Sequence, residues 1–153
     1  MTREIRLTKG YIAIVDDEDF DAVSKFSWHA NDNGRRVYAA RKSCGSNFWM
    51  HREIIDAPSE MKVDHIDNNG LNNRRSNLRL ATVTQNNANT GLRRNNKSGH
   101  KGVFWNRQMK KWQAQIRFEN KCFHLGYFTD VGLAAEAYAD AAQRLFGEFS
   151  RLK

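Results

Sequence analysis

Residues 63–89 read VDHIDNNGLNNRRSNLRLATVTQNNAN, a stretch with one His, eight Asn and few bulky side chains. Asn-rich segments are usually loops, because the short amide bonds to nearby backbone and tolerates tight turns. A solvated loop is therefore the simplest interpretation of this stretch. An isolated Asp-His pair such as Asp64–His65 is also structural more often than catalytic, so a chemical role for it depends on the residues that accompany the pair.

The charge of the chain is concentrated in its second part. Residues 1–57 carry nine Lys or Arg and nine Asp or Glu, whereas residues 58–153 carry sixteen and eight and so account for the whole net charge of +8. Within residues 70–121, twelve basic side chains stand against one acid, Glu119. An ordinary solvated basic face is the alternative, but so one-sided a segment repels itself unless an anion neutralises it. Nucleic acid is the usual partner.

Length and composition indicate a globular protein inside the cell. The 153 residues suit one medium domain or two small ones, and 40% hydrophobic with 27% charged residues is a globular balance. The longest apolar run, Tyr11–Val15, is too short to span a membrane, and the polar first ten residues carry no apolar signal core. Cys44 and Cys122 are isolated, so we expect reduced thiols, no zinc site and a cytoplasmic location.

Residues 1–57 predict a small β-rich region. The expected elements are strands at 4–7 and 11–15, a helix at 16–26, a hairpin of 26–30 and 35–41 around the turn 31–34, and a short helix at 51–57. The acids at 16–19 complement the dipole of the helix that they open. A metal cluster built from Asp16, Asp17, Glu18 and Asp19 is the alternative interpretation.

Residues 100–153 predict three strands and one helix. The strands are expected at 100–105, 112–118 and 120–128, and the helix from Thr129 or Asp130 to about Phe146. In the middle strand apolar and polar side chains alternate with a period of two. The expected apolar face of the sheet comprises Trp112, Ala114, Ile116, Phe118, Phe123, Leu125 and Tyr127, and the polar face Gln113, Gln115, Arg117, Cys122 and His124. The expected packing stripe of the helix is Leu133, Ala137, Tyr138, Ala141 and Leu145.

Hydrolysis of a phosphodiester would use both members of the Asp64–His65 pair. The reaction must deprotonate a water and stabilise negative charge on the leaving oxygen, and a neutral His and a divalent cation usually perform these tasks. Mg²⁺ prefers oxygen ligands and keeps several waters, so Asp64 and one Asn carbonyl suffice to bind it. Because neighbouring side chains on a strand point to opposite faces, we expect His65 to act on water without ligating the same ion.

The segment DHIDNNGLNNRRSNLRLATVTQN, residues 64–86, resembles the ββα-metal motif of HNH endonucleases, which are found in many phages and introns. The Asp-His pair, the Asn-Leu dipeptide and the helical Asn of that family correspond here to Asp64–His65, Asn77–Leu78 and Asn86. The resemblance implies that Asp64 and Asn86 hold one divalent cation per active site, Mg²⁺ or Mn²⁺, and that His65 is the general base. It implies that Asn77 braces the loop and so holds the imidazole in its tautomer and orientation. Asn86 stands where many relatives carry His, which favours a hard ion over zinc.

Residues 98–150 resemble the Apetala/ethylene-response-factor DNA-binding domain through KGVFW, WQAQIR, HLGYF and the alanine-rich AAEAYADAAQRLFGE. In that family a three-stranded antiparallel sheet lies in the DNA major groove, backed by one helix. The resemblance implies that DNA is contacted by Lys101, Gln115, Arg117 and His124, with Asn106 and Lys111 as further candidates. Phe104, Cys122, His124 and Gln115 depart from common plant residues, so base preferences do not carry over. Arg117 either reads a guanine bidentately or contacts phosphate alone.

Together these patterns predict an α+β protein with four parts. These are a β-rich scaffold region at 1–57, an HNH hairpin-helix catalytic unit at 58–92, a basic linker at 93–99, and a three-stranded antiparallel sheet packed on one C-terminal helix at 100–153. The expected function is a metal-dependent, homing-type endonuclease of double-stranded DNA, acting as a nicking monomer or as a homodimer. The alternatives are a DNA-binding regulator or decayed nuclease without cleavage activity, and an RNA-binding protein.

Several basic and polar residues are also assigned roles by the sequence. The expected DNA contacts outside the C-terminal module are Arg74, Arg75, Arg79, Arg93, Arg94 and Lys97, with solvated loop charge as the alternative for the first three. The residues interpreted as turn formers are Asn68, Asn69, Asn72 and Asn73. His29, His51 and His100 are interpreted as structural, and a role in the site is the alternative for His51.

Overall fold

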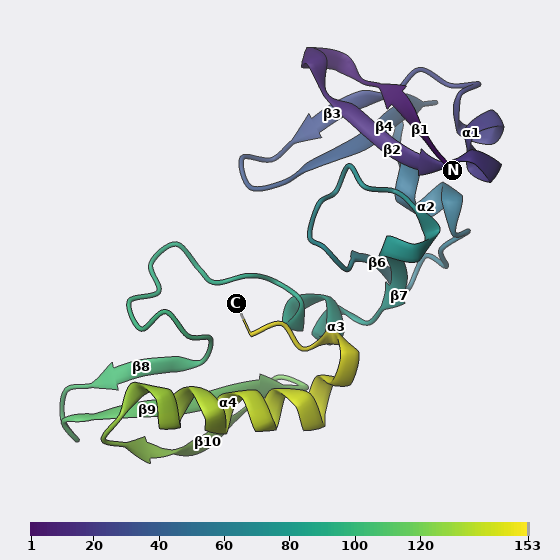
Figure 1. Cartoon of the computed structure of the whole chain (residues 1–153). Coiled ribbons are helices and arrows are strands. Elements are labelled where there is room, and N and C mark those ends of the chain that lie inside the picture. The colour runs from purple at the N-terminus through teal and green to yellow at the C-terminus, as the bar shows by residue number, and fades with distance from the viewer. Residues whose placement is uncertain (153) are drawn as a thin grey trace. The chain divides into compact units, whose positions relative to one another are not determined.

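The computed structural model describes residues 1–152, which form two compact units that divide between Thr82 and Val83 (Figure 1). Short helices and small antiparallel sheets make up both units, so the predicted α+β class is confirmed. Among the described residues, no helix has the length and apolar character needed to cross a membrane.

The first unit is built from three small antiparallel sheets, with strand orders β1-β2, β3-β4-β5 and β6-β7. Its elements are β1 (Thr2–Arg6), η1 (Thr8–Gly10), β2 (Ile12–Asp16), α1 (Asp17–Val23), β3 (His29–Asp32), β4 (Val37–Ser43), β5 (Ser46–Trp49), α2 (Met50–Ile54), β6 (Lys62–His65), η2 (Arg75–Asn77) and β7 (Leu78–Ala81). The sequence predicts the hairpin β3-β4 but not β5, which turns back from β4 through Cys44 and Gly45, both at positive φ.

One hydrophobic core joins these elements. Trp28 is 5% exposed and its indole Nε1 donates to the carbonyl of Val23, 2.8 Å away, which satisfies the polar edge of the largest core side chain. The buried members of this core are Ile5, Leu7, Ala13, Val15, Val23, Trp28, Ala30, Ala39, Met50, Ile54 and Leu78. Leu78 belongs to β7, so the strand that follows the Asn-rich loop is anchored in the core of the N-terminal region.

The Asn-rich loop between β6 and β7 is fastened to strand β2. The amide of Ile14 donates to the carbonyl of Leu71 at 2.8 Å, and the amide of Asn73 donates to the carbonyl of Ile14 at 2.7 Å. The amide of Arg75 donates to Oδ2 of Asp16, also at 2.8 Å. Ile14 and Asp16 therefore hold this loop against the N-terminal strands.

The second unit contains a three-stranded antiparallel sheet, in the order β8-β9-β10, and one long helix (Figure 1). Its elements are α3 (Val83–Ala88), β8 (Val103–Asn106), β9 (Lys111–Phe118), β10 (Lys121–Phe128), α4 (Val131–Phe146) and η3 (Gly147–Phe149). Asp130 caps α4 through bonds from the amides of Gly132 and Leu133. A Cβ on Gly102 would lie 2.3 Å from the Tyr138 ring, so this glycine allows α4 to pack closely at the start of the sheet.

Two packing predictions for the second unit are wrong in detail. A bulge between His124 and Gly126 shifts the register of β10. Beyond the bulge, Tyr127 pairs with Gln113 on the polar face and is 40% exposed, while Leu125 and Phe128 pack on the core. Phe123 precedes the bulge, opposite Ile116, and is 44% exposed.

The stripe of α4 matches the prediction at Ala141, which is buried, and at Tyr138, which packs on the core, but not at its two leucines. Its buried residues are Ala134, Ala141, Ala142 and Phe146. The predicted members Leu133 and Leu145 are 51% and 37% exposed. The prediction for Trp112 is confirmed, because its side chain packs against the cluster of Val103, Ala114 and Ala134.

Candidate active site

Asp64 and His65 lie at the end of β6, and both side chains are buried. Their exposed fractions are 1% and 4%. β6 pairs with β7 so that Asp64 stands opposite Arg79 and His65 opposite Leu78. The hairpin therefore holds a carboxylate and an imidazole in adjacent positions of one strand.

The carboxylate of Asp64 is bound by the guanidinium of Arg79. Nε and Nη2 of Arg79 each lie 2.9 Å from Oδ2 of Asp64, and the arginine side chain is 13% exposed. This ion pair offsets the cost of burying the carboxylate. Arg79 is thus engaged in the hairpin rather than extended from a solvated loop.

Asn77 holds the loop together through Asp67. Its Oδ1 accepts from the amide of Asp67 at 3.0 Å, and its Nδ2 donates to Oδ1 of Asp67 at 2.9 Å and to the carbonyl of Asn72 at 2.8 Å. Nδ2 of Asn72 donates to the other oxygen of Asp67 at 2.6 Å. Burial alone would raise the pKa of Asp67, but the hydrogen bonds from Asn69, Asn72 and Asn77 lower it.

The side chain that contacts the imidazole of His65 is Asn73. Oδ1 of Asn73 lies 3.2 Å from Nε2 of His65, and Asn73 is 0% exposed. Its Nδ2 donates to the carbonyl of Leu71 at 3.3 Å and lies 3.6 Å from Sδ of Met50. The interpretation of Asn73 as a simple turn former is therefore wrong, because its amide is buried in the site.

Aromatic rings surround the other sides of His65. The ring centroid of His51 lies 5.0 Å from that of His65 at an interplanar angle of 83°, and that of Tyr38 lies 5.8 Å away. Trp49 stacks on His51 at an angle of 22°. Among the buried side-chain atoms of the described residues, Nδ1 of His51 has no hydrogen-bond partner. His51 thus packs directly against His65, which is consistent with a structural role and with the alternative role in the site.

Burial keeps both imidazoles neutral. It lowers the pKa of His51 to about 3, with smaller effects from the charges of His65 and Arg52. Burial also lowers the pKa of His65, and the charge of Arg36 acts in the same direction. The bond to Asn73 and the charges of Asp67 and Asp64 oppose the shift of His65. A buried neutral imidazole is a suitable acceptor for a proton near pH 7.

The acids at the start of α1 bind Arg75. Nη2 of Arg75 lies 2.7 Å from Oδ1 of Asp19, which is 6% exposed, and Nε lies 3.3 Å from Oε1 of Glu18. Ligand atoms of Asp16, Glu18 and Asp19 lie within 4.8 Å of one another. Because the guanidinium and the backbone amide of Arg75 already contact all three, these carboxylates serve to hold the loop.

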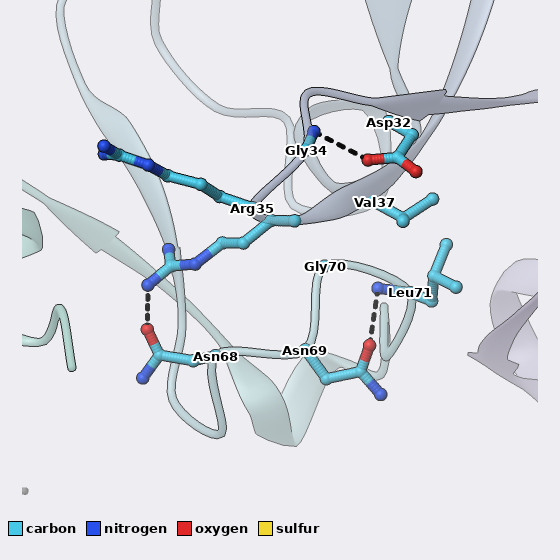
Figure 2. A pocket seen from close by; sticks show the side chains of 9 residues that line it. Asp32, Gly34, Arg35, Val37, Asn68, Asn69, Gly70 and Leu71 are labelled. Atoms are coloured by element: carbon cyan, nitrogen blue, oxygen red, sulfur yellow. Dashed lines mark hydrogen bonds between the residues drawn. The ribbon is translucent and has the colours of Figure 1, made fainter. Parts of the chain in front are cut away.

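An open cavity of about 470 Å³ lies between the tip of the β3-β4 hairpin and the Asn-rich loop. Figure 2 shows two arginine side chains from the hairpin and Asn68, Asn69 and Gly70 from the loop around it. Arg36 donates to Oδ1 of Asn68, and Arg35 is exposed. The sequence gives no reason to single out Arg35 or Arg36 as site residues, because acidic and basic residues are equal in number over residues 1–57.

In the second unit, three polar residues of the sheet meet on one face. Nδ2 of Asn106 donates to Oε1 of Gln113 at 2.9 Å, and Nε2 of Gln113 lies 3.3 Å from Nδ1 of His124. Gln115 pairs in register with His124, and Arg117 is exposed on β9. The predicted polar face thus exists as a connected surface.

Other predicted contact residues have different surroundings. Nζ of Lys101 donates to the carbonyl of Ala88 at 2.6 Å, and burial lowers the pKa of this lysine to about 8. Asn86 is half-buried on α3 of the second unit. Nε of Arg74 donates to Oδ1 of Asn72 at 2.9 Å. The exposed basic residues are Arg93, Arg94, Lys97 and Lys111.

Sequence reasoning misses Asn73, His51 and Tyr38 as neighbours of His65. Asn73 is one of eight Asn in residues 63–89, and nothing in its local pattern sets it apart. His51 and Tyr38 belong to α2 and β4, so only the tertiary fold brings them to the imidazole. For His51, the sequence pattern that could have indicated a buried position is its apolar neighbourhood in WMHREII, residues 49–55.

Comparison with known proteins identifies the family. A family model described as HNH endonuclease matches residues 56–88. The uncharacterized HNH endonuclease L560 of Acanthamoeba polyphaga mimivirus is 33% identical over 144 residues, which cover 93% of this chain and 74% of the relative. Protein 3.8 of Escherichia phage T7 is 31% identical over 96 residues, covering 63% of this chain and 78% of the relative. No solved structure matches the chain.

The buried Asp64–His65 pair lies within the segment that the family model matches, and the similarity to the mimivirus protein extends over nearly the whole chain. The chain therefore belongs to the HNH endonuclease family.

Proposed function

We propose that the protein is a metal-dependent, homing-type endonuclease of double-stranded DNA. The observation that carries this proposal is the buried, neutral imidazole of His65 beside the buried carboxylate of Asp64, within the HNH segment. Phosphodiester hydrolysis requires a general base that deprotonates the attacking water and a carboxylate that binds the divalent cation.

In this proposal His65 accepts a proton from the attacking water. The water oxygen forms a bond to phosphorus in line with the leaving oxygen, the bond from phosphorus to the 3′ oxygen breaks, and that oxygen is protonated. The products are 5′-phosphate and 3′-hydroxyl ends, as the family resemblance implies. Asn77 keeps the loop in shape through its bonds to Asp67 and Asn72.

Asp64 and Asn86 are the proposed ligands of one Mg²⁺ or Mn²⁺. A carboxylate and an amide oxygen are hard donors, which fits these ions better than zinc. HNH nucleases generally use a divalent metal, which supplies charge stabilisation to the phosphate and the leaving oxygen when it is bound. The buried carboxylate of Asp64 is paired with the guanidinium of Arg79.

The proposed DNA contacts come from both units. In the second unit we assign the ethylene-response-factor-like role to the face with Asn106, Gln115, Arg117 and His124, and further contacts to Lys101 and Lys111. The other proposed phosphate contacts are Arg74, Arg75, Arg93, Arg94 and Lys97, whereas the guanidinium of Arg79, predicted as a further contact, is bound to Asp64. To these we add Arg35, because it is exposed at the rim of the cavity beside the Asn-rich loop.

Nicking of supercoiled plasmid tests the function. With Mg²⁺ the wild-type protein is expected to convert supercoiled plasmid carrying its own flanking locus to nicked or linear DNA, and chelation of the metal should stop the reaction. His65→Ala should be inactive, whereas His29→Gln, on β3, should retain activity. Linear product at the first turnover would indicate a homodimer, and nicked product a monomer. A wild-type protein that shifts duplex DNA on a gel yet cuts no substrate would instead be the DNA-binding regulator.

A further inference from the structure

Resting on the proposed binding of double-stranded DNA, we propose that one face of the sheet β8-β9-β10 selects A·T base pairs in the major groove. We call the face of this sheet that points away from α4 the reading face. On it, Gln115 contacts the edge of adenine, and Phe104 contacts the methyl group of thymine.

The strand register decides which side chains share the reading face. Val103 and Ala114 pair across β8 and β9 and are buried on the side that packs against α4. Because side chains alternate along a strand, the neighbouring pair of Phe104 and Gln113 points to the reading face. Beyond its bulge, β10 places Tyr127 opposite Gln113 as well. Phe104 and Tyr127, each 40% exposed, therefore flank Gln113 on its two sides.

The positive charges of the reading face lie at the ends of β9. Lys111 and Arg117 are exposed there and share the face with Gln113 and Gln115 by alternation. Six residues of a strand span about 20 Å, so these two cations suit phosphates on the two sides of a major groove about 12 Å wide. Between them β9 presents only uncharged amides to the groove.

Hydrogen bonds across the sheet leave one of these amides available. Nδ2 of Asn106 donates to Oε1 of Gln113 at 2.9 Å, and Nε2 of Gln113 lies 3.3 Å from Nδ1 of His124. This chain crosses all three strands and engages both polar atoms of Gln113. The side-chain amide of Gln115 is half-buried and has no protein hydrogen-bond partner among the described residues. Gln115 therefore presents both a donor and an acceptor to a base.

The chemistry of the base edges indicates which pairs fit this face. Glutamine bonds bidentately to N6 and N7 of adenine, and phenylalanine makes apolar contact with the thymine methyl group. Guanine is usually read by Arg or Lys, and the N4 donor of cytosine by Asp or Glu. Residues 100–128 contain one acid, Glu119, which lies in the turn between β9 and β10. The centre of the reading face thus carries readers for adenine and thymine but no charged reader for guanine or cytosine.

The spacing of the two readers matches the stacking of base pairs. Phe104 pairs with Gln113, so Gln115 is its diagonal neighbour on β9. Such neighbours lie about 7–8 Å apart, which corresponds to roughly two base-pair steps of 3.4 Å. Gln115 and Phe104 therefore contact A·T pairs within about three consecutive base pairs.

Exposed aromatic rings on a sheet can instead stack on the unpaired bases of a single strand. Here the ring of His124 already lies against Tyr127, with centroids 4.5 Å apart. Gln113 stands between Tyr127 and Phe104 in the register of the sheet. The two exposed rings therefore form no continuous platform, which favours contact with the edges of paired bases.

Selection from a pool of randomised duplexes tests the base preference. The full chain is used with a chelator, so that binding is measured without cleavage. We expect enrichment of duplexes with neighbouring A·T pairs in a common core. Enrichment of G·C cores, or no enrichment, would overturn the inference. Competition between a selected duplex and one of its single strands tests the stacking alternative, and preference for the single strand would also overturn the inference.

Replacement of thymine by uracil in a selected duplex tests Phe104, because it removes only the methyl group. Wild-type affinity should fall about fourfold for each contacted methyl, and an equal affinity for the two duplexes would contradict the proposed contact. Phe104→Ala should bind both duplexes equally, and a retained difference would exclude this residue. Phe123→Ala is the matched control, because Phe123 is 44% exposed but pairs with the buried Ile116 on the side of α4.

Replacement of adenine by 7-deazaadenine removes the N7 acceptor and tests Gln115. Gln115→Ala should lower the preference for the selected duplex over a G·C duplex about 5–150-fold, and it should bind the adenine and 7-deazaadenine duplexes equally. Gln143→Ala, at an exposed position of α4, is the matched control and should keep both differences. An unchanged preference in Gln115→Ala would exclude this residue.

The selection and the nicking assay separate this inference from the proposed function. A protein that nicks plasmid but does not enrich A·T pairs keeps the proposed function and loses this inference. A protein that enriches A·T duplexes but never nicks DNA keeps this inference and loses the proposed nuclease activity.

Discussion

Arg79 binds Asp64 through two nitrogens that share one carboxylate oxygen, each at 2.9 Å from Oδ2. The two residues stand directly opposite each other on β6 and β7. The pair is nearly excluded from water, with side-chain exposures of 1% for Asp64 and 13% for Arg79. The cross-strand contact therefore stabilises the hairpin and at the same time positions a proposed metal ligand.

Arg79→Ala should destabilise the protein strongly. Removal of the guanidinium leaves a buried carboxylate without its cation, which typically costs ~3–5 kcal/mol of unfolding free energy. Arg3→Ala is the control, because it breaks the exposed pair with Asp17 and should cost less than about 1 kcal/mol. Urea unfolding at pH 7, followed by Trp fluorescence, measures both. In an Asp64→Asn background the cost of Arg79→Ala should largely vanish, and equal costs in the two backgrounds would contradict this account of the pair.

Stability should fall as the pH drops below about 6.5. The folded-state pKa of His51 is about 3 and its ordinary value is 6.5, so between these values the unfolded chain binds a proton that the folded protein does not. Each pH unit below 6.5 therefore removes up to ~1.4 kcal/mol of stability for this residue. The lowered pKa of His65 acts in the same direction. Urea unfolding between pH 7.5 and 5 (roughly the range of His titration) checks the slope, which should become shallower in His51→Phe.

Asn86→Ala should weaken metal binding. A direct ligand should matter at least as much as an outer partner, so the Mg²⁺ concentration for half-maximal nicking should rise roughly tenfold or more. Asn87→Ala is the matched control, since Asn87 is the exposed neighbour on the same helix. Asp64→Asn should weaken the response to Mg²⁺ further, because it removes the charged ligand. An unchanged Mg²⁺ titration for Asn86→Ala would remove this residue from the ligand set.

Arg35→Ala should weaken DNA binding and its dependence on salt. If Arg35 neutralises one backbone phosphate, its loss lowers the slope of log binding constant against log salt by about 0.9 for duplex DNA. Lys42→Ala, an exposed cation of β4 outside the cavity, is the control for net charge. Fluorescence anisotropy with labelled duplex at several salt concentrations measures both slopes. Identical slopes for the two variants would mean that Arg35 contributes only general charge.

The sequence predicts regular elements where local patterning and tertiary environment agree. The alternation in residues 112–118 places β9, because one face of that strand is buried against α4 and the other is polar. The β10 prediction fails on the face of Tyr127, because a strict period of two cannot foresee a bulge. The short strand β5 is missed for a similar reason, since four residues give too little pattern.

In the candidate site, too, the sequence predicts the local relationships and misses the tertiary ones. The spacing of Asp64, His65 and Asn77 is local, and the structure places all three residues in or directly beside the β6-β7 hairpin. The neighbours of His65 are not local, because Asn73 reaches it through a loop fastened on β2 and His51 through α2. The pairings of Arg75 with Asp19 and Arg79 with Asp64 are likewise tertiary, and net charge alone cannot distinguish such paired arginines from solvated ones.

The hydrogen bond from Lys101 to the carbonyl of Ala88 determines where this chain can be joined to another protein in a chimera without breaking the second unit. The helix α3 packs with α4 and η3 inside the second unit, and the division between the units falls at Thr82 and Val83, within the matched segment 56–88. A chimera joined at the basic stretch 93–99 would separate Asn86 and its helix from the lysine that holds it. A chimera joined at Thr82 would carry that helix along with the C-terminal sheet. Recombination that preserves this packing therefore inherits Asn86, the last residue of the motif, together with the C-terminal sheet.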